Sequence, residues 1–132
     1  MTYFPEDAKV FSSEYTVYMV DTDAGGVVHH SRYVSWLEAG RIDMLDQTQK
    51  TYADYVAEGL HFVVVSVDIS YHSPLRFGDK FVIQSAIVSQ ARASFYVKSR
   101  FLKDGNTMCT SMVKLAAIRE KDWKIVKLPS LL

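Results

Sequence analysis

The chain has only one cysteine, Cys109, among its 132 residues, so no disulfide can form within it. Cys109 lies in the apolar-rich run 108–117, where a small buried thiol is expected rather than a reactive one. The sequence also has no second cysteine and no His-x3-His spacing, which argues against a zinc site. We therefore expect no metal, and the lone thiol fits a reducing compartment.

Long apolar runs and an excess of charge of one sign are also missing. No stretch approaches the roughly 20 apolar residues that span a bilayer, and residues 1–10 lack the apolar core of a signal peptide. The 15 basic and 15 acidic residues cancel, so no global field favours nucleic acid or an anionic membrane. We expect a cytoplasmic enzyme or binding protein that holds any anionic ligand with a local basic cluster.

The pattern of apolar residues predicts one domain over residues 1–132, because no linker divides a chain of this length. Alternation predicts a strand over 14–20, followed by a glycine-containing loop over 21–26. From about Ser31 the apolar period becomes helical, and a shorter helix is expected over 52–58. The stripe of the long helix comprises Tyr33, Leu37, Gly40 and Met44.

The rest of the chain predicts strands joined by short connections, which makes an α+β architecture of one long helix on one antiparallel sheet. The expected strands are 62–71, 80–90, 94–102, 107–119 and a short last one over 123–128. Gly40 costs a helix about 1 kcal/mol relative to alanine, so we expect another backbone to approach the helix there. One helix covers only one face of a sheet, so we expect a partner subunit to cover the remaining apolar area.

The segment 21–33 carries the residues suited to chemistry, because Asp21 and Asp23 lie on a loop that leads into the long helix. The first amides of a helix have no partners within it, and the helix dipole adds positive potential there. A carbonyl held at that point would be polarised, and a nearby carboxylate could attack its carbon or activate a water. From the residues alone, a metal loop or an anion site also fits this pattern, and simple capping of the loop by the aspartates is favoured.

Two motifs narrow this choice. The first reads Asp-Thr-Asp-Ala-Gly-Gly-Val-Val over 21–28, then His30, Tyr33, Glu38 and Arg41; the second covers 71–79. Together they resemble the 4-hydroxybenzoyl-CoA thioesterase family, in particular its Tol-Pal-associated branch of small acyl-CoA thioesterases. The similarity extends over nearly the whole chain.

The resemblance implies a hotdog fold, in which a long central helix is wrapped by an antiparallel sheet of about five to six strands. It implies an acyl-CoA thioesterase in which Asp23 is the catalytic carboxylate and the amide at His30 donates to the thioester carbonyl. Coenzyme A would enter only as part of the substrate, and no other cofactor is expected. The resemblance also implies a homo-oligomer, a dimer or a dimer of dimers, with active sites between subunits.

Four further residues are candidates for substrate binding. Tyr33 is expected in the core or lining the pocket. Glu38 either pairs with Arg41 or places a polar group at the end of the acyl pocket. Arg92 and Ser94, at a turn into a strand, are the candidates for holding coenzyme A.

Several alternatives remain open at this stage. Asp21 is expected to fix the loop through local side-chain to backbone bonds. The family usually has Tyr or Phe where this chain has His29, which leaves the acyl group undetermined. An acyl-carrier-protein thioesterase and a non-catalytic acyl-CoA-binding or scaffolding hotdog protein are the competing functions, and the presence of Asp23 argues against the second.

Overall fold

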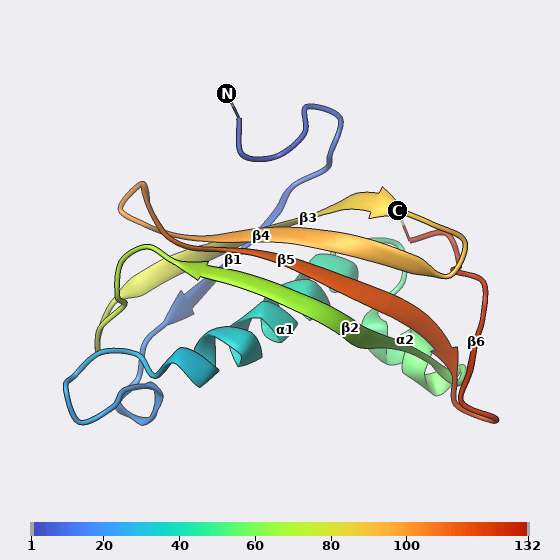
Figure 1. Cartoon of the computed structure of the whole chain (residues 1–132), viewed down its shortest axis with the longest axis horizontal. Helices are drawn as coiled ribbons and strands as arrows, with labels where there is room; N and C mark the ends of the chain where they lie inside the picture. Colours follow the sequence, from blue (N-terminus) through green and yellow to red (C-terminus); the bar gives the residue numbers. More distant parts are fainter. Residues whose placement is uncertain (1, 132) are drawn as a thin grey trace.

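The structure is a computed structural model that describes residues 2–131, and it consists of a curved antiparallel sheet with one long helix on its concave side (Figure 1). The strands follow the order β1-β3-β4-β5-β2, and β6 pairs with β5. The helices and the short 3-10 turn η1 are η1 (Met19–Asp21), α1 (His30–Asp46) and α2 (Tyr52–Ala57). The strands are β1 (Phe11–Thr16), β2 (Leu60–Tyr71), β3 (Lys80–Gln90), β4 (Ser94–Lys103), β5 (Asn106–Arg119) and β6 (Lys124–Ile125).

Helix α1 is pressed closely against β3, as its glycine predicts. A Cβ atom built on Gly40 would lie 2.9 Å from Cγ2 of Ile83 and 3.5 Å from Oγ of Ser85. The close neighbours are thus side chains of β3 rather than the backbone that we expected. The predicted stripe is confirmed, since Tyr33, Leu37, Gly40 and Met44 are all buried.

The first strand differs from the prediction. β1 ends at Thr16 rather than at residue 20, although Val17 still donates to the carbonyl of Asp79 at 2.9 Å. The amide of Tyr18 then donates to the Asp21 carboxylate at 2.8 Å, and this bond turns the chain into η1. The alternation of apolar and polar residues continues to residue 20, so it predicted a longer strand. The strand ends earlier because of the hydrogen bond from Tyr18 to Asp21, which the alternation does not reveal.

Cys109 has the environment that its apolar neighbours predict. Its side chain is fully buried on β5, and burial raises the pKa of its thiol to about 12. The thiol is therefore unreactive at neutral pH.

The concave side of the sheet is left open along β2. Val64, Val67 and Tyr71 pair with β5 residues whose side chains are buried in the core, so they face the same side. They are nevertheless 47%, 43% and 51% exposed. β2 is also an edge strand of the sheet. One helix therefore leaves part of the apolar inner face uncovered. None of the helices in residues 2–131 is long and apolar enough to cross a membrane.

Candidate active site

The loop between η1 and α1 is fixed by backbone hydrogen bonds. The amide of Asp23 donates to the carbonyl of Val27 at 2.9 Å, and the amide of Gly26 donates back to the carbonyl of Asp23 at 3.1 Å. The amide of Val28 donates to the carbonyl of Leu75 at 2.8 Å, which ties the loop to the segment before β3. Gly26 has φ +80°, a conformation that glycine adopts without strain.

The two aspartates of the loop have opposite environments. Asp21 is 2% exposed, and its carboxylate accepts from Nε of Arg32 and from the amide of Tyr18, both at 2.8 Å. Asp23 is exposed, and its carboxylate accepts from the amide of Gly25 at 2.8 Å. Asp21 therefore holds the loop, as predicted, whereas Asp23 presents a carboxylate to an approaching molecule.

Helix α1 begins at His30, beside this loop. His29 caps the helix, and its Nδ1 accepts from the amide of Ser31 at 3.2 Å. The rings of His29 and His30 stack with their centres 4.5 Å apart. Within residues 2–131, the amide of His30 has no hydrogen-bond partner. It is therefore free to donate to a carbonyl oxygen, and the helix dipole strengthens that interaction.

A hollow of about 280 Å³ lies at this end of α1, and its lining includes His30, Tyr33 and Tyr71. Tyr33 is 3% exposed, and its hydroxyl accepts from the amide of Leu75 at 3.3 Å. Tyr33 thus belongs to the core and also borders the hollow, and its role in substrate binding remains a prediction. Burial raises the pKa of its hydroxyl, which keeps it neutral.

Sequence reasoning assigned no role to the segment 71–74, although it belongs to the second motif. Tyr71, His72, Ser73 and Pro74 form one wall of the hollow, and the hydroxyl of Tyr71 donates to the carbonyl of His30 at 3.4 Å. The two motifs, far apart in the sequence, therefore meet at one site. The resemblance of 71–79 to the family was the available signal.

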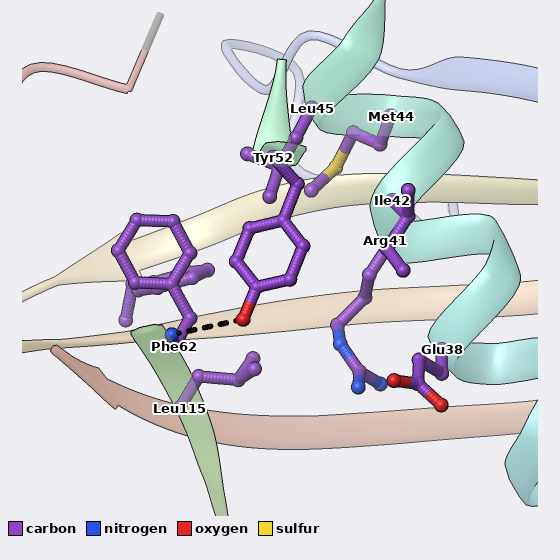
Figure 2. A pocket seen from close by; sticks show the side chains of 9 residues that line it. Glu38, Arg41, Ile42, Met44, Leu45, Tyr52, Phe62 and Leu115 are labelled. Carbon is purple, nitrogen blue, oxygen red and sulfur yellow. Dashed lines mark hydrogen bonds between the residues drawn. The ribbon is translucent and has the colours of Figure 1, made fainter. Parts of the chain in front are cut away.

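Glu38 and Arg41 lie on α1 about two and three turns beyond the hollow. Across residues 2–131, no ion pair within 4.0 Å joins them. They border a separate small cavity, in which the Arg41 side chain extends toward Glu38 (Figure 2). The pairing expected from their spacing is thus not formed as a close contact.

Arg92 and Ser94 are not brought near Asp23 within one chain. The loop that carries Asp23 lies at the Lys80 end of β3, because Thr16 pairs with Lys80 and Val27 forms a bridge to Arg76. Arg92 follows the other end of β3, which is 11 residues long and spans roughly 35 Å. The two ends are far apart in Figure 1.

The part of the chain that the structure describes contains no cluster of three or more His, Cys, Asp or Glu side chains that could hold a metal ion. The independence from metal remains a prediction.

Comparisons with known proteins agree with the fold and with the family resemblance. The model of the thioesterase-like superfamily matches residues 17–132. The acyl-CoA thioester hydrolase YbgC of Escherichia coli O157:H7 is 37% identical over 92 residues, which cover 70% of this chain and 69% of that protein. The acyl-CoA thioesterase YbgC of Haemophilus influenzae is 30% identical over 122 residues, which cover 90% and 88%.

Solved structures share the architecture. A probable thioesterase from Bartonella henselae is 30% identical with a TM-score of 0.81, and the match covers 91% of this chain and 98% of that one. A hypothetical protein from Aquifex aeolicus is 26% identical with a TM-score of 0.86, over 90% and 93%. The predicted hotdog fold, the family resemblance and the prediction of a thioesterase are confirmed by these matches. The chain belongs to the thioesterase-like superfamily.

Proposed function

We propose that this protein hydrolyses the thioester of an acyl-CoA to a free carboxylic acid and coenzyme A, with Asp23 as the catalytic carboxylate. The observation that carries the proposal is the contrast between the two loop aspartates. Asp21 is buried and paired with Arg32, whereas Asp23 is exposed on the loop that leads to the free amide of His30. The names of the YbgC relatives support acyl-CoA as the substrate.

The chemistry follows from these two groups. The thioester carbonyl oxygen accepts from the amide of His30, which stabilises the negative charge that develops as the carbon is attacked. Asp23 either attacks that carbon itself or removes a proton from the attacking water. When Asp23 acts as the base, the carbon–sulfur bond breaks, the proton taken from the water passes to the sulfur, and coenzyme A leaves as the thiol. When Asp23 attacks, the carbon–sulfur bond breaks with formation of a mixed anhydride on Asp23, the thiolate takes a proton from water, and a second water hydrolyses the anhydride to the free acid. Both routes require an ionised Asp23 and no metal.

The proposal includes a cytoplasmic homo-oligomer. A second copy of the chain would cover the exposed inner face of β2, where Val64 and Val67 are 47% and 43% exposed. Only an assembly allows Arg92 and Ser94 to serve an active site, because within one chain they lie at the far end of β3 from Asp23. In that assembly they would hold the coenzyme A of a neighbouring subunit's substrate.

Light scattering at micromolar concentration tests the assembly. We expect a mass at least twice the 15.0 kDa of one chain, because the open apolar face of β2 would otherwise remain in water. A mass near 15 kDa under these conditions would contradict the oligomer.

Release of free thiol from a panel of acyl-CoAs tests the reaction. We expect hydrolysis of at least one acyl-CoA, at a rate that a chelator such as EDTA leaves unchanged, because the proposed site consists of a carboxylate and a backbone amide. Loss of activity on chelation that added zinc restores would overturn the mechanism. Acyl-carrier-protein thioesters serve as the comparison substrates, and a strong preference for them would redirect the proposal to that substrate class.

A further inference from the structure

A small, partly open cavity lies between the C-terminal half of α1 and the concave side of the sheet, with the exposed Glu38 among its lining residues (Figure 2). Its walls are mostly apolar and include Met44, Phe62 and Leu115. Its free volume is about 30 Å³, more than the about 10 to 15 Å³ that one water needs. The cavity therefore has room for one group of about the size of a water molecule or a hydroxyl.

Arg41 brings a charge to this apolar place. Its side chain is half-buried, and burial lowers the pKa of its guanidinium, an effect that Glu38 opposes. Within residues 2–131, no hydrogen bond and no ion pair within 4.0 Å satisfies that guanidinium. A guanidinium keeps its charge in a protein, and buried charges are ordinarily paired. Within the described chain, no protein group in contact with the guanidinium accounts for an arginine at this position.

The cavity shares one face of α1 with the proposed active site. His30, Val34, Glu38 and Arg41 lie four, four and three residues apart, which places them along one side of a helix. Val34 is 48% exposed, so within one chain nothing covers this side of the helix. Eleven residues separate His30 from Arg41, a rise of about 16 Å.

β2 forms the opposite wall along the same path. Tyr71 borders the hollow at His30, Phe62 borders the cavity at Arg41, and the exposed inner-face residues Val64 and Val67 lie between them. Apolar side chains of β2 thus line the route from the free amide of His30 to Arg41, and the second copy proposed above would form its outer wall. The route suits a hydrocarbon chain that ends in a polar group, and a single aromatic ring on the carbonyl would be far too short to reach Arg41.

We propose that Arg41 and Glu38 determine specificity by binding a hydroxyl at the far end of a medium-length acyl chain. The proposal rests on the proposed function and names its substrate class, a terminally hydroxylated acyl-CoA. The guanidinium donates to the hydroxyl oxygen, and the hydroxyl donates to the Glu38 carboxylate, so one neutral group satisfies both side chains. A terminal carboxylate would be repelled by Glu38, and a methyl end would leave Arg41 unpaired.

Matched substrates test the proposal. We expect kcat/KM for 10-hydroxydecanoyl-CoA to exceed that for decanoyl-CoA by about tenfold or more, as a hydrogen bond to a charged group allows. The octanoyl and dodecanoyl pairs cover the neighbouring lengths. Arg41→Met should abolish the preference, and Arg41→Lys should restore part of it. Arg119→Met is the matched control, because Arg119 pairs with Asp122 on the surface.

Measurements of substrate binding test this inference independently of the proposed catalytic function. The same pairs are titrated by calorimetry into the Asp23→Asn protein, with and without Arg41→Met. Tighter binding of the hydroxylated member that requires Arg41 supports the inference even if the wild-type protein hydrolyses nothing. Hydrolysis of every pair without preference overturns the inference and leaves the proposed function standing. A preference for decanedioyl-CoA overturns the choice of a hydroxyl.

The melting temperature of Arg41→Met distinguishes a role of Arg41 in substrate binding from a role in the fold. If Arg41 serves the substrate, Arg41→Met should leave Tm unchanged or raise it, because methionine fills the apolar cavity without a buried charge. A Tm lowered by several degrees, together with an unchanged substrate preference, would assign Arg41 to the fold and overturn the inference.

Discussion

Replacement of Asp23 by asparagine should lower kcat by at least about 100-fold, the lower end of what a general base contributes. A nucleophilic role would make the loss at least as large. The substitution is nearly isosteric, and the carboxamide oxygen can still accept from the amide of Gly25 that now binds Asp23 at 2.8 Å. The loop should therefore keep its conformation, and only the charge is lost.

Substrate affinity should change far less than turnover in this variant, because the free amide of His30 still holds the carbonyl. Stopped-flow measurement of a single turnover, with binding followed separately by calorimetry, distinguishes the two effects. A variant that retains more than about a tenth of the wild-type rate would contradict the assignment. Glu38 on α1 would then be the next carboxylate to examine.

Replacement of Asp21 by asparagine should mainly lower the stability of the protein, whereas replacement of Asp23 should mainly lower turnover. Its buried carboxylate accepts from Arg32 and from the amide of Tyr18, both at 2.8 Å, and the negative charge strengthens both bonds. We expect a loss of about 2 kcal/mol in the free energy of unfolding, because each hydrogen bond to a charged group contributes about 1.5 to 3 kcal/mol and asparagine retains part of the geometry. Tm should fall by roughly 5 to 10 °C.

Thermal unfolding of the two asparagine variants beside the wild-type protein provides the measurement. Asp23→Asn is the matched control, because Asp23 is exposed and should leave Tm nearly unchanged. Equal Tm values for Asp21→Asn and the wild-type protein would show that the Asp21–Arg32 pair does not hold the loop.

Most of the fold could be predicted because residue alternation and helical spacing record which side of an element is buried. The range 80–90 was predicted from alternation and is the range of β3, in which Phe81, Ile83 and Ile87 are buried. The start of α1 was predicted within one residue. The predicted end of β1 was wrong, because the chain is turned there by the hydrogen bond from Tyr18 to Asp21 and not by a change in the residue pattern.

The site was only partly predictable, because motifs identify residues but not their distances. The local bonding predicted for Asp21 is confirmed, yet the sequence did not reveal Arg32 as its partner. The catalytic role of Asp23 came from the family resemblance and remains a prediction. Arg92 was chosen from its position at a turn, and only the strand order shows that this turn lies far from Asp23 within one chain. Likewise, the motif placed Glu38 and Arg41 on one helix but did not show which strands line the cavity beside them.

The most direct test of Asp23 as the catalytic carboxylate is the relative turnover of the two loop variants, measured as thiol release from one acyl-CoA at a temperature where both proteins are folded. Asp23→Asn should be slower than Asp21→Asn by at least about tenfold, because the first removes the reacting charge and the second only loosens the loop. Equal rates, or a slower Asp21→Asn, would contradict the assignment of Asp23 as the catalytic carboxylate.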